Sequence, residues 1–257
     1  MNSKTLIFSV TDKICTITLN RPDALNAFNQ RLRLDLLKAI QTAQDDDTVR
    51  VIILKGEGKG FCAGADLGEG LDRDIGSELL NEYKPIMMAL QESDKTCIAQ
   101  CHGPVAGIGG GLAMACDMVF MAEKSYMYMA FAAISLIPDG GINWHLYNRL
   151  GPRKAFEVIV EGQRLTAQEC LSYGICNAVL SENELESRVT EQARKIASGA
   201  PLAQSALKKV MRQMAGKSLS QAIDLEAEIQ QPLTQSEDCR NAISAFFAKE
   251  KPVFEGK

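Results

Sequence analysis

One acidic residue lies between a proline and a glycine pair in the segment SLIPDGGINW, and its two interpretations lead to different chemistry. A Pro-Asp-Gly-Gly sequence is typical of a turn, in which the carboxylate of Asp139 would bond to nearby backbone N–H groups. The apolar segment YMYMAFAAI precedes it, so the same carboxylate can also lie in a pocket. Burial there would raise its pKa and make it a base near neutral pH.

Two glycine-rich segments, residues 56–64 (GEGKGFCAG) and 103–113 (GPVAGIGGGLA), each follow an apolar strand-like run. Neither fits a nucleotide motif: Leu112 stands where a dinucleotide fingerprint needs its third glycine, and the first segment lacks the flanking residues of a P-loop. The second opens into a helix whose first N–H groups have no intrahelical partner. Together the loops can bind an oxyanion, although spacing alone favours glycines that serve only tight packing.

Nucleophilic and metal chemistry have little support. The chain has two histidines, His102 and His145, and neither has a cysteine or carboxylate at metal-ligand spacing, so we predict no metal site and a structural role for each. Cys62 lies in a suggestive loop, but a small buried hydrophobic residue is the better interpretation.

The elements around these segments follow an α/β pattern. Residues 14–20 and 49–56 are strand-like and 26–44 has helical spacing, which predicts a strand, a helix and a parallel strand. The pattern repeats, and beyond about Thr166 it changes to amphipathic helices. The further strands are expected at 96–103 and 117–123, and the further helices at 108–116, 183–199, 201–214 and 218–230.

Composition bounds the function class. The 257 residues are 46% hydrophobic and 23% charged with a net charge of -4, which indicates a globular protein and argues against nucleic-acid binding. No apolar run reaches the roughly 18 residues of a membrane span. Eight cysteines without CxxC spacing favour a reducing compartment, and neither end matches a targeting signal, so we expect the cytoplasm and no membrane partner.

Four segments in order, RPDALNAF, GFCAGADL, HGPVAGIGGGLAMACD and LIPDGG, resemble the enoyl-CoA hydratase/isomerase, or crotonase, superfamily. The resemblance runs from about Ile14 to Phe254 and is closest to the enoyl-CoA isomerase and ring-epoxyphenylacetyl-CoA isomerase branch. It implies an α/β fold, a spiral of ββα turns in residues 1–200 with a helical trimerisation region in 201–257. It also implies a homotrimer or dimer of trimers and an acyl-CoA substrate, whose coenzyme A is part of the substrate rather than a cofactor.

The resemblance also assigns roles to individual residues. The backbone N–H groups of Ala65 and Ile108 would hold the thioester oxygen, and Asp139 matches the acid of the enoyl-CoA isomerases. The two glutamates of the hydratases are replaced by Gly111 and Phe131. We expect Phe131 and Trp144 beside the acyl group, and residues 70–92 to set most of the pocket. The contacts to coenzyme A would come from Asp23, Ala24, Leu25, Ala63, Asp66, Leu67, Phe246 and Lys249.

These residues predict an acyl-CoA isomerase that converts a 3-enoyl-CoA to a 2-enoyl-CoA through an enolate, with Asp139 as general base and acid. Burial near Phe131, Ile137 and Trp144 should raise the pKa of Asp139. The alternatives are a ring-1,2-epoxyphenylacetyl-CoA isomerase, an enoyl-CoA hydratase and a non-catalytic acyl-CoA-binding protein. A dehalogenase-like reaction, with Asp139 as nucleophile, would need a supporting histidine that the sequence does not place.

Overall fold

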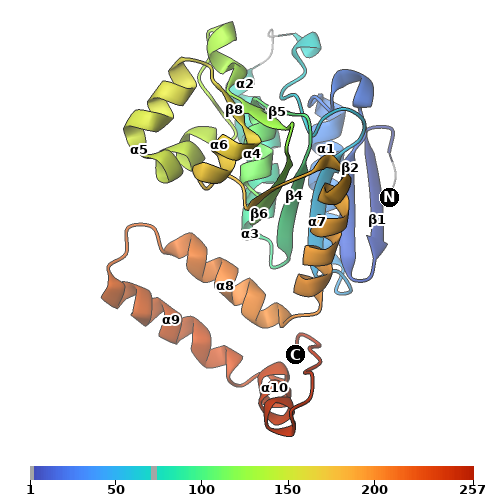
Figure 1. Ribbon diagram of the computed structural model, residues 1–257, viewed down its shortest axis with the longest axis vertical. Helices are drawn as coiled ribbons and strands as arrows, with labels where there is room; N and C mark the ends of the chain where they lie inside the picture. Colours follow the sequence, from blue (N-terminus) through green and yellow to red (C-terminus); the bar gives the residue numbers. More distant parts are fainter. Residues whose placement is uncertain (1–2, 71–73) are drawn as a thin grey trace.

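The computed structural model describes residues 3–70 and 74–257, and its centre is a six-stranded sheet (Figure 1). The strand order is β1-β2-β3-β4-β6-β9, in which only the β1–β2 hairpin is antiparallel. The apolar run of β3 is buried on both faces, as expected for the middle of a parallel sheet. The strands are β1 (Leu6–Thr11), β2 (Ile14–Leu19), β3 (Val51–Gly56), β4 (Thr96–Cys101), β6 (Met118–Ala122) and β9 (Ala178–Leu180).

A second, three-stranded sheet has the order β5-β7-β8 and completes the ββα turns. Each of β4 and β6 continues after a short connection into a strand of this small sheet, and a helix follows. The short strands are β5 (Pro104–Ala106), β7 (Tyr126–Tyr128) and β8 (Arg164–Thr166). The repeated ββα unit that the sequence predicted is therefore present.

Helices cover both faces of the large sheet. The helix α7 (Glu182–Ala197) packs on one face over Val51, Ile53 and Ile98, and the larger core on the other face contains residues of α1, α3 and α4. The helices before α7 are α1 (Gln30–Asp45), α2 (Ile75–Glu78), a π-helical turn (Leu79–Tyr83), α3 (Lys84–Glu92), α4 (Ile108–Met114), α5 (Ile142–Val160) and α6 (Ala167–Ser172). Short 3₁₀ turns occur at Pro22–Ala24, Leu67–Glu69 and Ala130–Ile134.

The first helix begins later than its periodicity predicted. Leu25 and Asn26 have positive φ angles of 47° and 59°, so residue 26 cannot be helical, and the Asn29 side chain caps the helix by accepting from the N–H of Leu32. The Asn26 side chain instead donates to the carbonyls of Glu57 and Gly60, at 2.9 and 2.8 Å. This turn therefore joins the start of α1 to the loop after β3.

The last three helices, α8 (Pro201–Gln213), α9 (Leu219–Leu233) and α10 (Glu237–Ala248), extend away from the sheet core (Figure 1). The sequence predicted α8 and α9 but not α10. They leave large apolar side chains exposed, among them Leu219 at 79%, Phe246 at 77% and Phe247 at 78%. The division at residue 200 and the trimerisation role stay predictions. Within the described residues no helix is long and apolar enough to span a membrane.

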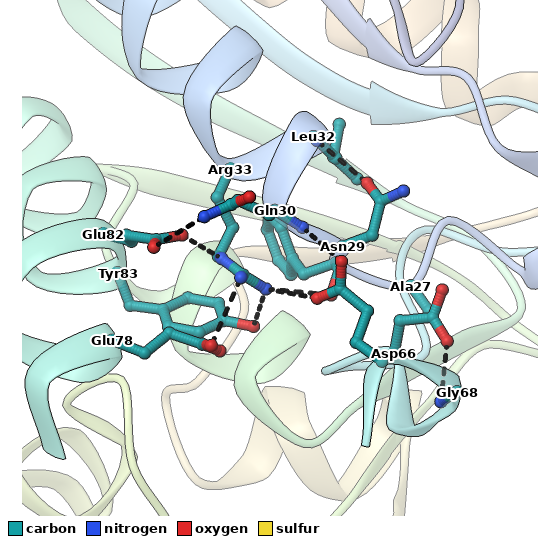
Figure 2. A network of polar contacts seen from close by, with 12 residues as sticks. Ala27, Asn29, Gln30, Leu32, Arg33, Asp66, Gly68, Glu78, Glu82 and Tyr83 are labelled. Atoms are coloured by element: carbon teal, nitrogen blue, oxygen red, sulfur yellow. Dashed lines mark hydrogen bonds and ion pairs between the residues drawn. The ribbon is translucent and has the colours of Figure 1, made fainter. Parts of the chain in front are cut away.

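A buried arginine fixes the segment that follows the first glycine-rich loop (Figure 2). Arg33 of α1 has a side chain 1% exposed and lies 3.2 Å from Glu69, 3.3 Å from Glu78 and 2.6 Å from Glu82. Its guanidinium also lies over the ring of Tyr83, 5.1 Å from the centroid. A guanidinium has five donors, so this one side chain can bind carboxylates from three short helical segments, Leu67–Glu69, Ile75–Glu78 and Leu79–Tyr83.

We predict that Arg33→Met lowers the free energy of unfolding by about 3 kcal/mol, because it leaves buried carboxylates without their counter-charge. The matched control is Arg31→Met in the same helix, whose side chain is 69% exposed and paired with Asp35. A surface pair of this kind is worth about 1 kcal/mol or less. Urea unfolding of both variants is the measurement, and equal losses would contradict the role of Arg33.

Candidate active site

The loop after β3 leaves one backbone donor without a partner. Phe28 donates to the carbonyl of Gly64 at 2.7 Å, and Asp66 donates to the carbonyl of Phe28 at 2.9 Å. This parallel bridge passes over Ala65, whose N–H has no acceptor among the described residues. The first donor predicted from the sequence is thus available to bind an oxyanion.

The second donor is at the start of α4. Gly107, with φ 50°, turns the chain from β5 into the helix, and its own N–H donates to the carbonyl of Tyr128. The next N–H, that of Ile108, is the first of the helix and finds no acceptor in residues 3–70 and 74–257. The two loops touch backbone to backbone: a Cβ on Gly64 would lie 3.4 Å from the Cα of Gly107. The positive φ angles of Gly64 (102°) and Gly107 (50°), and the 3.0 Å from a Cβ on Gly64 to the carbonyl oxygen of Ala106, are what favour glycine at both positions.

Asp139 lies in the loop between the turn Ala130–Ile134 and α5, and its carboxylate is largely buried. The Oδ1 atom is inaccessible and has no hydrogen-bond partner in the described part of the chain. Burial raises the pKa of Asp139 to about 6, and the negative charge of Glu78 acts in the same direction. A carboxylate with this pKa can both accept and return a proton near neutral pH.

The Asp139 loop packs tightly on α4. A Cβ on Gly111 would lie 2.5 Å from the carbonyl oxygen of Gly140, and a Cβ on Gly140 would lie 2.5 Å from Cγ1 of Ile108. Real Cβ atoms essentially never come closer than 3.0 Å to such neighbours. The glycines thus bring the carboxylate beside the helix that carries the second donor.

Asp139 also lines a cavity of about 520 Å³. Leu79, Tyr83, Met87 and Met88 form part of its wall, so the segment 70–92 contributes as predicted, although its residues 71–73 lie outside the described residues. Trp144 and His145 of α5 line it as well. A mostly apolar cavity with a few polar groups in its wall, among them Asp139, Lys84 and His145, suits an organic acyl group.

The predicted coenzyme A contacts near the N-terminus gather around the first donor. Asp23 and Ala24 form a 3₁₀ turn that ends at Leu25, whose carbonyl accepts from the N–H of Ala63 at 2.9 Å. On the other side Asp66 pairs with Arg21 at 2.9 Å, and Leu67 is 57% exposed. These residues thus flank Ala65 on one accessible edge.

The remaining predicted residues divide into two groups. Phe131 is buried, with its Cζ 3.9 Å from the position of a Cβ on Gly107, so it lies beside the second donor. Phe246 and Lys249 are at the end of α10, and no residue of α8, α9 or α10 lines the Asp139 cavity. Within one chain the structure does not bring these two residues to the site.

The expected source of Asp139 burial was partly wrong. Ile137 is 80% exposed and Trp144 58% exposed, so neither is the closed apolar cover that the sequence suggested. His145 is an additional residue near Asp139 that sequence reasoning did not assign to the site, and Glu78, within the predicted segment 70–92, was not singled out as a neighbour of the acid. The available sequence signal for His145 was its position six residues after Asp139, across the start of a helix. No sequence signal singled out Glu78.

Cys62 is structural, as predicted. Burial raises the pKa of its thiol to about 12, and Sγ donates to the carbonyl of Asn26 at 3.2 Å. A thiol that stays protonated at neutral pH is not a nucleophile.

We predict that Asp139→Asn makes the folded protein more stable above about pH 6. The folded pKa of about 6 exceeds the usual value of 3.8 for an aspartate, so folding favours the protonated acid, and stability falls as pH rises through this interval. Asparagine avoids burying the charge. Thermal unfolding should show a higher midpoint for the variant at about pH 8 and a shrinking difference toward about pH 4. A variant that is less stable at about pH 8 would contradict the burial of a charged Asp139.

Comparison with known proteins identifies the family. The model of the enoyl-CoA hydratase/isomerase family matches residues 9–257. The chain is 32% identical to the 1,2-epoxyphenylacetyl-CoA isomerase of Escherichia coli K12, over 98% of both chains. It is 31% identical to a probable enoyl-CoA hydratase of Rhodobacter capsulatus, over the full length of both.

A solved structure, that of an enoyl-CoA hydratase subunit from Geobacillus kaustophilus HTA426, superposes with a TM-score of 0.92 at 29% identity. The match covers 99% of this chain and 100% of the other. These matches confirm the predicted resemblance and the crotonase-like α/β fold. The chain belongs to the enoyl-CoA hydratase/isomerase family.

Proposed function

We propose that the protein is an enoyl-CoA isomerase that moves the double bond of a 3-enoyl-CoA to the 2-position. The observation that carries the proposal is the buried carboxylate of Asp139, with a pKa of about 6, in an apolar cavity beside α4. It is the only acidic side chain at the three positions where the family resemblance expects catalytic acids, since Gly111 and Phe131 occupy the others.

The reaction needs one base and one oxyanion site. The N–H groups of Ala65 and Ile108 bind the thioester oxygen, and Asp139 takes a proton from C2. The C–H electron pair forms the C1–C2 double bond of the enolate, and its negative charge resides on the bound oxygen. When the enolate collapses, the oxygen pair reforms the C1–O double bond and the C1–C2 pair becomes the C2–C3 double bond. The C3–C4 pair forms the new bond at C4 to the proton that Asp139 returns. No electrons leave the substrate, so no redox cofactor is required.

Hydration is the weaker alternative because the water would have no carboxylate. A glutamate at position 111 would place its Cβ 2.5 Å from the carbonyl of Gly140, so the backbone of this site disfavours the hydratase arrangement. Phe131, buried against the second donor loop, offers no polar group either. A non-catalytic acyl-CoA-binding role would leave the raised pKa of Asp139 without a purpose.

The second candidate is isomerisation of a ring-1,2-epoxyphenylacetyl-CoA. The E. coli relative with that activity in its name covers nearly the whole chain, and the same oxyanion site and single acid would serve both substrates.

We further propose that the chain works as a homotrimer or a dimer of trimers in the cytoplasm. The exposed apolar side chains of α9 and α10, including Leu219, Ile223 and Phe247, support an interface there. A neighbouring subunit would receive Phe246 and Lys249 at its coenzyme A site. Free cysteines, seven of the eight buried, agree with a reducing compartment.

We predict that Asp139→Asn lowers isomerase turnover by roughly two or more orders of magnitude, the size of a lost general base, while acyl-CoA binding persists. For the unchanged protein, kcat/KM should rise with pH up to about 6 and then level off, because only the ionised carboxylate accepts the proton. Formation of conjugated thioester from 3-enoyl-CoA is the assay. Asp224→Asn, at an exposed position in α9, is the control. Turnover of Asp139→Asn near that of the control would refute the base.

We predict that hydration of a 2-enoyl-CoA is at least about 100-fold slower than isomerisation, since Gly111 and Phe131 stand where the hydratases carry the two glutamates that position water. Gly111→Glu should gain no hydratase activity and should unfold at lower temperature, because its Cβ would collide with the carbonyl of Gly140. Loss of the conjugated thioester measures hydration. Hydration as fast as isomerisation in the unchanged protein would overturn this assignment.

A further inference from the structure

The cavity that ends at Asp139 contains a histidine that the proposed reaction does not use. His145 lies in the first turn of α5, lines the cavity together with Asp139 and Trp144, and is only 5% exposed. No hydrogen bond in the described structure joins it to Asp139. Buried polar side chains normally have hydrogen-bond partners, so the partners of its two ring nitrogens decide what this imidazole can do.

The protonation state of His145 follows from its neighbour. The Nη1 atom of Arg149 lies 3.2 Å from Nδ1 of His145. A guanidinium can only donate, so Nδ1 must be the unprotonated acceptor. Arg149 is held in place by donating to the carbonyl of Gly174 at 3.1 Å. Burial, together with the charge of Arg149, lowers the pKa of His145 to about 4. The ring is therefore neutral, with its hydrogen on Nε2.

The Nε2–H group has no acceptor in residues 3–70 and 74–257. Gly141 leaves its edge uncovered: a Cβ at that residue would lie 3.7 Å from Cδ2 and 3.9 Å from Nε2. Much of the cavity wall is apolar, including Leu79, Met87 and Met88. His145 is thus buried as a residue, while its donor atom is not among the fully inaccessible polar atoms and has no protein partner, so a ligand acceptor in the cavity can reach it and add affinity.

We propose that Nε2–H of His145 donates a hydrogen bond to a neutral oxygen on the acyl group, so that the enzyme prefers oxygenated acyl-CoA substrates over plain hydrocarbon chains. This specificity role rests on the proposed function, because it takes the Asp139 cavity as the acyl site. The oxygen is a carbonyl, ether or epoxide. Lys84 also lines the cavity and is the residue that could pair with a carboxylate, so the proposal for His145 concerns neutral oxygens, which need no counter-charge.

Binding of saturated thioesters tests this without turnover. Hexanoyl-CoA and octanoyl-CoA are titrated calorimetrically against their congeners with one keto group, at C4 or C5 of the hexanoyl chain and at C4 to C7 of the octanoyl chain. At least one keto compound should bind about five- to tenfold more tightly than its hydrocarbon parent, the effect of one hydrogen bond to a buried donor. His145→Leu should abolish this preference and keep hydrocarbon binding, and His145→Gln, which retains a donor, should restore part of it. Tyr147→Leu, at an exposed position of the same helix, is the control.

Two results would overturn the proposal: no keto compound is preferred by the unchanged protein, or the preference persists in His145→Leu. If that variant does not fold, Arg149→Met decides, because freeing Nδ1 lets the tautomer change and should weaken the preference. Nitrogen NMR of the imidazole gives an independent check, and a hydrogen on Nδ1 at neutral pH would also refute the proposal. A keto preference without isomerase turnover would refute the proposed function alone, and turnover without a preference would refute this inference alone.

Discussion

The chemistry of the site depends on keeping one carboxylate away from water. Asp139 loses solvation when its loop packs against α4, and this burial is the largest cause of its raised pKa. Burying the charge of Asp139 lowers the free energy of unfolding, and the packing of the surrounding residues must offset that loss. The parallel sheet and its two cores supply that packing. Because the environment disfavours the ionised form of Asp139, this carboxylate binds a proton more strongly than a carboxylate in water does.

Arg33 forms ion pairs with the acidic residues beside the cavity. Glu78 is near enough to Asp139 to raise its pKa, and the same glutamate pairs with buried Arg33. The arginine therefore offsets part of the negative charge of Glu69, Glu78 and Glu82 close to the buried Asp139 (Figure 2). Glu78 thus links the ion pairs of Arg33 to the pKa of Asp139.

The sequence predicted those elements whose patterns lie within a short stretch of the chain. The apolar runs of β3 and β4 and the periodicity of α7 to α9 predicted their positions, and ordered motifs predicted the family. It misplaced the start of α1 because positive φ angles at Leu25 and Asn26 are set by contacts with residues 57–60. For the site, the motifs pointed to Ala65, Ile108 and Asp139, whose catalytic roles stay predictions. The ion pairs of Arg33 and the tautomer of His145 could not be predicted, because both depend on partners that only folding brings together.

The contact between Gly111 and Gly140 also bears on motion. With no side chain between the two backbones, the helix that carries the Ile108 donor and the loop that carries Asp139 cannot slide past each other independently. Thermal fluctuations of the surrounding segments then displace the proton acceptor and the oxyanion donor in concert. Because the oxyanion donor fixes where a bound thioester lies, the separation of these two groups sets the distance from the base to C2, to which proton transfer is sensitive, and this contact keeps that distance nearly constant.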